Sequence, residues 1–267
     1  MKRLSYKGKT VILTGASSGI GLEIARELIL KHGAIVYAIA RGRERLKTAE
    51  KELASGYVPV PMDAGDKGAW ESLYERLKSE GKTVDVLINC AGILPEFKSY
   101  EKTEEKELLS AMNINVNSQL YSSKIMLPII NKGGAIINVS SAAALCPFGG
   151  ISLYALTKSA SCAFTQALGC ELDGISASAV LPGFVKTDIM KNQEATDKES
   201  RLISFFSASP KSCVRKILRR ARRRRGKIVV GLDARLMSAL YTLFPSRAPK
   251  IITRFLKISG LKLFSKI

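Results

Sequence analysis

The 267-residue chain contains a single histidine, His32, and five cysteines with no Cys-x-x-Cys pair among them. Zinc sites and disulfide frameworks need clusters of such residues, so the sequence predicts neither a metal site nor a disulfide network. Cysteines without an evident pairing pattern are typical of a reducing compartment, which favours a cytoplasmic location.

Long apolar runs are missing as well. No uncharged apolar stretch reaches the length of a membrane-spanning helix, so none is predicted. The basic N-terminal segment MKRLSYKGKT is not followed by the apolar stretch of a signal peptide. With 46% apolar residues, the chain can still bury one large core or two small ones.

Acidic residues are almost absent from the C-terminal part of the chain. Residues 211–267 hold 17 Lys or Arg and one acid, Asp233, whereas residues 1–210 hold 25 basic and 22 acidic side chains. The net charge of +19 is therefore concentrated near the C-terminus. We predict a body over residues 1–230 and a basic helical extension over residues 231–267.

Short and long apolar runs alternate along the body. The short runs are rich in Val and Ile, as in parallel strands covered on both faces, and the longer runs have helical periodicity. The pattern predicts an α/β fold with a doubly wound parallel sheet of about seven strands. The predicted strands are Thr10–Thr14, Ile35–Ala40, Tyr57–Val60, Val84–Asn89, Ala135–Val139, Ser176–Leu181 and Lys227–Val230, and the helices cover about 19–31, 44–54, 67–80, 104–131, 153–172 and 211–225.

The stretch LTGASSGIGLEIA, residues 13–25, places three glycines between the first predicted strand and the first helix. Gly15 permits a sharp turn, while Gly19 and Gly21 let the backbone and the helix approach a pyrophosphate. The free N–H groups of the helix N-terminus attract phosphate. A glycine-rich turn without a ligand is the alternative, but a position that opens an α/β alternation favours a dinucleotide site.

The end of the second predicted strand indicates which dinucleotide binds. NAD-binding sheets usually place an acid here for the ribose 2′-hydroxyl, and YAIARGRERL, residues 37–46, has none at the strand end. Arg41 and Arg43 follow instead, and arginine pairs well with a 2′-phosphate. The sequence favours NADP(H), with Asp63 as a partner for the adenine amino group; solvated arginines are the alternative.

Tyr154 and Lys158 are four residues apart and share one face of the helix predicted over 153–172. A phenol with a pKa of about 10 is a poor acid or base at neutral pH, but a nearby ammonium group favours the phenolate. Ser141 lies 13 residues before Tyr154, just after the fifth predicted strand. Its hydroxyl can hold a carbonyl oxygen while Tyr154 transfers a proton.

Together these segments resemble the short-chain dehydrogenase/reductase family, and in particular its hydroxysteroid dehydrogenase and carbonyl reductase members. The matching motifs occur in the family's order between residues 10 and 190. They are Thr14-Gly-x-x-x-Gly-x-Gly21, Asn89-Cys-Ala-Gly92, Asn115 within NINVNS, Ser141, Tyr154-x-x-x-Lys158, and Pro182-Gly183 followed by Thr187. Cys90 departs from the pattern, because the family often has a second asparagine there.

The resemblance implies roles for these residues. Tyr154 would be the general acid/base, Ser141 would orient the substrate oxygen, and Lys158 would lower the pKa of Tyr154 and bind the nicotinamide ribose. Asn115 would anchor a water that relays protons through Lys158. The full cofactor-binding set that we expect is Gly15, Ser17, Ser18, Gly19, Ile20, Gly21, Arg41, Arg43, Asp63, Asn89, Ala91, Gly92, Tyr154, Lys158, Pro182, Gly183, Val185 and Thr187.

The resemblance also implies an oligomer and a substrate pocket. The family commonly pairs subunits through the two helices that correspond to 104–131 and 153–172, so we expect a homodimer or homotetramer. The expected substrate-binding residues are Leu94, Ser141, Cys146, Phe148, Ile151, Met190 and Phe205.

This expected lining is largely apolar and has no arginine or histidine to hold a carboxylate. A lipophilic ketone or secondary alcohol fits it. A hydroxysteroid, either a sterol or a bile acid, is the first expectation, and a fatty acyl or other lipid ketone is the second. A non-catalytic NADP(H)-binding sensor or scaffold is an alternative of another class.

The basic extension allows three interpretations. It packs on the body or on a neighbouring subunit, it lies on an anionic membrane surface, or it binds nucleic acid. The second interpretation rests on a predicted helix with Ile252, Phe255 and Leu256 on one side and Lys250, Arg254 and Lys257 on the other. The third is disfavoured, because no aromatic residues that stack on bases accompany the arginine run of residues 215–227.

Overall fold

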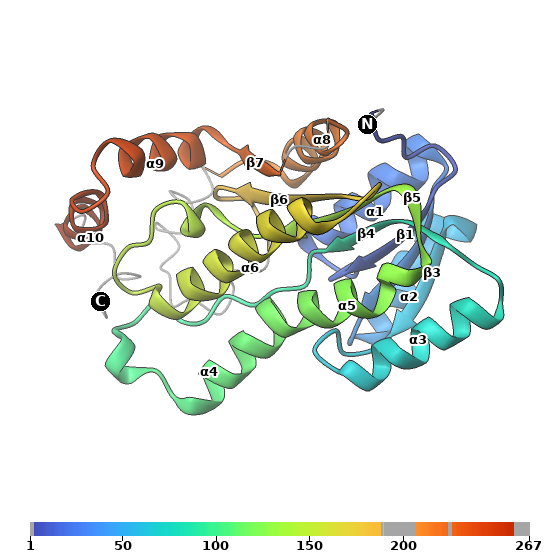
Figure 1. Cartoon of the computed structure of the whole chain (residues 1–267). Helices are drawn as coiled ribbons and strands as arrows, with labels where there is room; N and C mark the ends of the chain where they lie inside the picture. The colour runs from blue at the N-terminus through green and yellow to red at the C-terminus, as the bar shows by residue number, and fades with distance from the viewer. Residues whose placement is uncertain (1–2, 188, 190–206, 224–225, 259–267) are drawn as a thin grey trace.

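The computed structural model describes residues 3–187, 189, 207–223 and 226–258. All seven predicted strands are present and form one parallel sheet in the order β3-β2-β1-β4-β5-β6-β7 (Figure 1). The chain moves outward from β1 to β3, returns to place β4 on the other side of β1, and then moves outward again. This reversal makes the sheet doubly wound, as the sequence predicts. The strands are β1 (Thr10–Thr14), β2 (Ile35–Ala40), β3 (Tyr57–Pro61), β4 (Val84–Asn89), β5 (Ile130–Val139), β6 (Ser176–Pro182) and β7 (Lys227–Val230).

Helices cover both faces of the sheet. One face packs against α1 (Gly19–His32), α2 (Arg43–Leu53) and α8 (Pro210–Ala221). The other packs against α3 (Lys67–Ser79), α5 (Ser118–Met126) and α6 (Ser152–Glu171), with α4 (Glu105–Met112) beside α6 (Figure 1). Side chains alternate along each strand, so Val11 and Leu13 of β1 join the first layer and Ile12 joins the second. Burial on both faces explains why the strands are apolar throughout.

The long helix predicted over 104–131 is divided in the structure. After α4 the chain forms a π-helical turn at Asn113–Asn117, continues as α5, and ends in a short 3₁₀ turn at Leu127–Ile129. A π turn keeps the chain helical, so apolar periodicity does not reveal it. Pro128 sits at the start of the 3₁₀ turn, and β5 begins at Ile130, five residues earlier than predicted.

Two further helices follow β7. They are α9 (Leu232–Leu243) and α10 (Ala248–Ile258). Helix α10 is attached to the body, since the Gly149 backbone N–H donates to Thr253 Oγ1 at 2.8 Å and Leu256 packs on the buried cluster of Phe97 and Ile151. None of the helices in the described part of the chain combines the length and the hydropathy needed to cross a bilayer.

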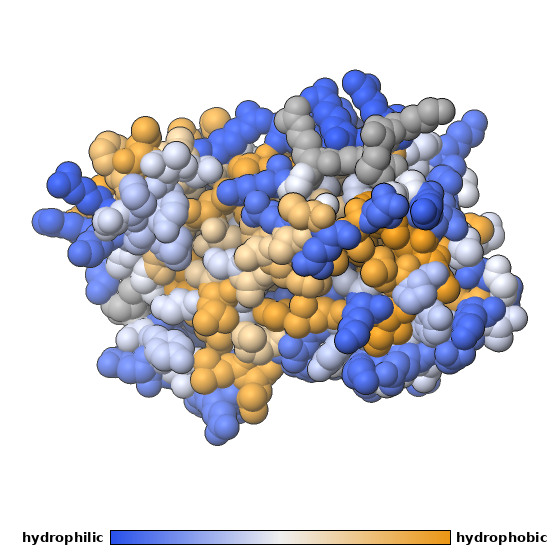
Figure 2. Space-filling model, viewed as in Figure 1, coloured by the Kyte–Doolittle hydropathy of each residue, from blue (hydrophilic) through white to orange (hydrophobic). Residues whose placement is uncertain are grey.

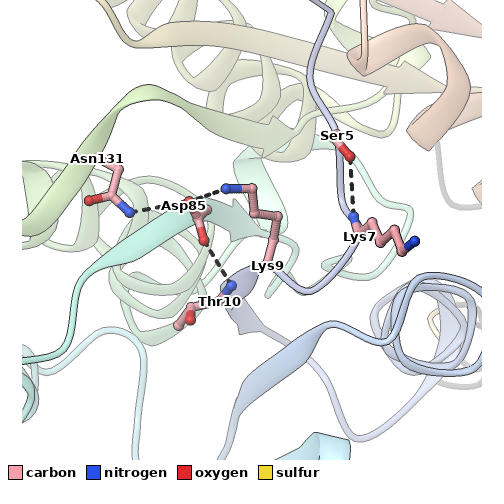
Figure 3. A network of polar contacts seen from close by, with 6 residues as sticks. All are labelled: Ser5, Lys7, Lys9, Thr10, Asp85 and Asn131. Atoms are coloured by element: carbon pink, nitrogen blue, oxygen red, sulfur yellow. Dashed lines mark hydrogen bonds and ion pairs between the residues drawn. The ribbon is translucent and has the colours of Figure 1, made fainter.

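Asp85 in β4 ties the beginning of the sheet together (Figure 3). Its carboxylate accepts from the Thr10 backbone N–H at 3.0 Å, from Lys9 Nζ at 2.9 Å and from Asn131 Nδ2 at 3.1 Å. Burial works to raise the pKa of the Asp85 carboxyl, but these three donors outweigh it and hold the pKa below its usual value. One side chain therefore links the ends of β1, β4 and β5.

Replacing Asp85 with alanine should lower the free energy of unfolding by about 1–3 kcal/mol at neutral pH, because the Thr10 N–H and the Asn131 amide lose their acceptor. The native pKa of Asp85 lies below that of the unfolded chain, so this contribution is present at neutral pH and is lost as the pH falls through the native pKa. Urea unfolding at a series of pH values measures both effects. Glu71→Ala, which removes an exposed ion pair with Lys67, is the control and should cost well under about 1 kcal/mol.

Candidate active site

A cavity of about 460 Å³ opens at the carboxyl ends of the strands. Its walls come from the loops that follow β1, β4, β5 and β6, together with residues of α6 and α9. The strand order reverses between β1 and β4, and ligands of doubly wound sheets bind at such a reversal.

The glycine turn after β1 is closely packed against the loop after β4. Thr14 Oγ1 accepts from the backbone N–H groups of Cys90 and Ala91, both at 3.0 Å. Gly15 has a left-handed φ of 68°, and a Cβ atom there would lie 2.9 Å from the Ala91 backbone nitrogen. A Cβ on Gly21 would collide with the Gly15 carbonyl oxygen. Glycine is thus required at both positions by the approach of two backbones.

The N-terminus of α1 faces this turn and is open to an anion. Ser18 occupies the N-cap position, but its side chain accepts no hydrogen bond from the first turn of α1, and that turn has no acidic residue. Ser18, Gly19 and Ile20 all line the cavity. The N–H groups and the positive end of the helix dipole are therefore directed at the place where a pyrophosphate would bind.

The arginines after β2 differ in their placement. Arg45, in the first turn of α2, lines the cavity, while Arg41 and Arg43 do not. Arg41 Nη1 lies 3.9 Å from Asp63 Oδ2, and the Arg41 side chain is 69% exposed. Asp63 also accepts from the Gly65 N–H at 2.9 Å, so it is engaged within its own loop. Sequence reasoning did not identify Arg45, although it belongs to the same RGRER run.

Ser141, Tyr154 and Lys158 meet in the cavity wall. Ser141 acts on the Tyr154 phenol and works to lower its pKa, and Ser141 Oγ accepts from the Ala143 N–H at 3.2 Å. Lys158 is buried, with its Nζ 5.6 Å from the Tyr154 ring centre and 3.2 Å from the Val139 carbonyl oxygen. The neighbouring Ser140 donates to the Lys158 carbonyl oxygen at 2.6 Å, so its hydroxyl anchors α6.

Burial dominates the ionisation of this group. It raises the pKa of Tyr154 to about 12, and the hydrogen bond from Ser141 only partly opposes it. It lowers the pKa of Lys158 to about 8, because the ammonium group is enclosed by protein. The sequence predicts that Lys158 lowers the tyrosine pKa, but in the structure this pKa is raised, because burial dominates and Ser141 is the group that opposes it. A further positive charge beside the phenol would shift the balance toward the phenolate.

Asn115 lies in the π-helical turn and clamps the loop after β4. Its Oδ1 accepts from the Ile93 N–H at 2.8 Å, while its Nδ2 donates to the Ile93 carbonyl oxygen at 3.0 Å and to Thr157 Oγ1 at 3.1 Å. A Cβ on Gly92 would lie 3.2 Å from both Asn115 Oδ1 and Lys158 Nζ. The asparagine is therefore beside the lysine, and its side-chain amide positions the loop.

Asn89 holds the scaffold beneath the cavity and does not line it. Its Nδ2 donates to Asn138 Oδ1 at 2.9 Å, and its Oδ1 accepts from Ser122 Oγ at 2.8 Å. Asn138 in turn donates to Thr165 Oγ1 at 2.8 Å. All four side chains are buried, so this chain of hydrogen bonds joins β4, β5, α5 and α6.

The remaining residues predicted to bind the cofactor differ in whether they line the cavity. Ser17 does not line the cavity, whereas Ala91, Gly92, Pro182, Gly183, Val185 and Thr187 do. The substrate end is apolar, with Leu94, Phe148 and Ile151 in the wall as predicted. Cys146 is fully buried in the protein and does not line the cavity, so its predicted contact with the substrate is not seen. Met190 and Phe205 lie outside the described residues.

Several lining residues were not among the expected site residues. Cys90 and Ser140 lie in motifs that the sequence singled out, whereas Phe97, Val139, Ala142, Ala143, Phe184, Asp233 and Met237 had no such signal. Asp233 and Met237 come from α9, in the segment that the charge pattern assigned to a separate extension. The Asp233 carboxylate accepts from the Phe184 N–H at 2.7 Å, which attaches α9 to the loop after β6. Among the described residues, no group of three His, Cys, Asp or Glu side chains is placed to hold a metal.

Replacing Gly21 with alanine should weaken dinucleotide binding by at least about tenfold, because the new methyl group displaces the turn that forms the phosphate cradle. Fluorescence titration with a reduced dinucleotide measures the change. Gly226→Ala is the matched control, since a Cβ there meets open space, and it should bind as the parent protein does. Equal affinities of the two variants would contradict this interpretation of the glycine turn.

Comparison with known proteins agrees with this geometry. The family model described as short chain dehydrogenase matches residues 9–198. An 11-beta-hydroxysteroid dehydrogenase-like protein of Arabidopsis thaliana is 33% identical over 82% of this chain and 73% of its own length. A very-long-chain 3-oxoacyl-CoA reductase of Anas platyrhynchos is 31% identical over 78% of this chain and 67% of its own.

A solved structure extends the comparison. A short chain dehydrogenase of Burkholderia cenocepacia, in complex with NADP, superposes with a TM-score of 0.76 at 25% identity and covers 87% of this chain and 100% of its own. The chain spans about two thirds to three quarters of the length of its curated relatives. The matched segment contains the glycine turn and the Ser141, Tyr154 and Lys158 group, and the chain belongs to the short-chain dehydrogenase family.

Proposed function

We propose that the protein is an NADP(H)-dependent oxidoreductase that interconverts a lipophilic ketone and the corresponding secondary alcohol. The observation that carries this proposal is that Ser141, Tyr154 and Lys158 line one cavity with a glycine cradle at one end and apolar side chains at the other. Membership of the short-chain dehydrogenase family supports it.

The residues present fit a dinucleotide. Gly15 and Gly21 leave a backbone cradle that a side chain would fill, and the N-terminus of α1 opens onto it. Arg45 in the first turn of α2, with Arg41 directly after β2, would hold a 2′-phosphate, and the Burkholderia relative bound to NADP supports the phosphorylated form. The bound nicotinamide supplies or accepts the hydride.

The protein's own residues handle the substrate oxygen and its proton. Ser141 and Tyr154 line the same cavity, and a carbonyl oxygen bound between them would accept from both hydroxyls. In reduction, Tyr154 donates its proton to that oxygen, and in oxidation it accepts the proton of the alcohol. Ser141 lowers the pKa of Tyr154 against the cost of burial, and a positive charge on Lys158, whose Nζ lies 5.6 Å from the ring centre, favours the phenolate in principle.

The apolar end of the cavity points to the substrate class. Leu94, Phe148 and Ile151 line it with no basic side chain among them, which suits a hydroxysteroid such as a sterol or bile acid. The Arabidopsis relative, by its name, supports this choice. A fatty acyl ketone is the second candidate, supported by the duck relative named as an oxoacyl-CoA reductase.

Pairing of subunits through α4, α5 and α6 is part of the proposal. Leu109, Leu120 and Leu156 lie on these helices and are 64%, 37% and 54% exposed. Exposed leucines on helices that are otherwise packed against the sheet support a homodimer or homotetramer with this face buried.

Tyr154→Phe should lower turnover of a steroid alcohol with NADP⁺ by at least about 100-fold, because the proton donor and acceptor is removed. Affinity for NADPH should change by less than about threefold, since the ring remains. Absorbance of the reduced nicotinamide and a fluorescence titration measure the two quantities. Full turnover by the variant would contradict the mechanism. If the parent protein binds NADPH but turns over no ketone, the result would favour the alternative of a non-catalytic NADP(H)-binding sensor or scaffold.

Arg45→Ala should weaken NADPH binding by about tenfold and leave NADH binding nearly unchanged, because only NADPH carries the 2′-phosphate. Arg41→Ala should have a smaller selective effect, because Arg41 does not line the cavity and its side chain is 69% exposed. Arg76→Ala, which removes an exposed arginine of α3 outside the cavity wall, is the control. Competition between the two nucleotides measures the preference, and equal losses of NADPH and NADH affinity would rule out the assignment.

A further inference from the structure

Helices α9 and α10 expose large apolar side chains in regular stripes. Leu232, Leu236 and Leu243 of α9 are 73%, 63% and 70% exposed. Their spacing, with Ala239 between them, places them on one side of the helix. Seven of the fifteen exposed large hydrophobic residues in the described structure lie between residues 232 and 258. Figure 2 shows hydrophobic side chains gathered over the α9 corner of the molecule.

Helix α10 has three distinct faces. Ala248, Thr253 and Leu256 face the body. The apolar stripe on its outside consists of Ile251, Phe255 and Ile258, which are 51%, 70% and 73% exposed. The side predicted from the sequence is thus divided, because Leu256 packs inward while Phe255 points outward.

A cationic row runs beside the apolar stripe of α10. Lys250, Arg254 and Lys257 are exposed and have the same four-and-three spacing as the stripe, so the two run parallel along the helix. The segment 231–258 has five basic residues and one acid, Asp233, whose carboxylate binds the Phe184 N–H. The outer surface of both helices therefore combines apolar side chains with positive charge alone.

Exposed apolar side chains beside positive charges favour an anionic lipid surface as the partner of these helices. A second copy of the same surface would bring two cationic rows together, and that repulsion opposes self-association. An anionic lipid surface accepts the apolar side chains between its head groups and attracts the adjacent cations. Lys250 and Arg254 are long enough to reach the head groups while Phe255 is buried among the chains.

The same helices lie next to the cavity. Asp233 and Met237 line it from the inner side of α9, and Leu256 of α10 packs on the buried cluster of Phe97 and Ile151, whose cavity-facing side chains belong to the wall. We propose that α9 and α10 dock the protein on an anionic membrane, with the apolar stripes in the lipid, so that a lipophilic substrate enters from the bilayer. The docking follows from the surface alone, while the route of the substrate rests on the function proposed above.

Co-sedimentation of the full-length protein with lipid vesicles tests the docking. The protein should partition at least about tenfold more onto phosphatidylglycerol/phosphatidylcholine vesicles than onto phosphatidylcholine alone. The double variant Leu236→Ser/Phe255→Ser should lose at least about tenfold of that binding. Its control is Leu30→Ser/Tyr100→Ser, a leucine and an aromatic residue of similar exposure outside α9 and α10, which should bind as the parent protein does.

A charge variant separates the electrostatic contribution to membrane binding from the apolar one. Lys250→Gln/Arg254→Gln/Lys257→Gln should weaken binding to anionic vesicles and remove its dependence on salt. Its control is Lys7→Gln/Lys31→Gln/Lys51→Gln, which changes the net charge equally at exposed sites elsewhere and should have much less effect. All variants should retain NADPH affinity, because none of these residues lines the cavity.

Two results would overturn the docking surface. One is failure of the parent protein to bind anionic vesicles at low salt. The other is unchanged binding by Leu236→Ser/Phe255→Ser, and sedimentation velocity would then show whether the stripes join subunits instead. Vesicle binding needs no turnover, so it is measured independently of the proposed activity. If the substrate route holds, the double variant should lose turnover only of a steroid embedded in anionic vesicles, with turnover of a detergent-dispersed one unchanged.

Discussion

The contact between the turn after β1 and the loop after β4 is the constraint on which the site depends. Thr14 Oγ1 holds two successive N–H groups of the β4 loop, and Gly15 lies so close to Ala91 that no side chain fits between them. Because the strand order reverses at this point, the helices that follow β1 and β4 leave on opposite faces and leave space between the loops. The close approach of the turn after β1 to the loop after β4 thus shapes both the phosphate cradle and the cavity.

Buried hydrogen bonds fix the positions of the reacting groups relative to the sheet. The hydrogen bonds from Asn89 through Asn138 to Thr165 fix α6 relative to β4 and β5, and Ser140 anchors the Lys158 backbone. Tyr154 and Lys158 are thereby held in an environment that disfavours both of their charged forms. The same burial that raises the tyrosine pKa excludes water and makes any added positive charge effective, so the free energy of ionisation is sensitive to what binds beside it.

The C-terminal helices are joined to this arrangement. Asp233 places one carboxylate between α9 and the loop after β6, next to glycines that have no room for a side chain. The inner side of α9 contributes to the cavity wall, and α10 packs on the neighbouring cluster of Phe97 and Ile151, while the outer sides of both helices remain apolar and cationic. Helix α9, which the charge pattern assigns to an appended extension, therefore contributes to the cavity wall in the fold.

The sequence by itself determined the sheet, because strand periodicity and the glycine turn are local patterns. It also placed Ser141 at a strand end and Tyr154 and Lys158 on one helix face, and the structure brings these three residues together in the cavity wall. It did not reveal the π turn that places Asn115, since a helical pattern continues through it. Nor did it select Arg45 over Arg43, exclude Cys146 or include Asp233 and Met237. Those assignments depend on which face of an element meets another element far along the chain, and only tertiary packing decides that.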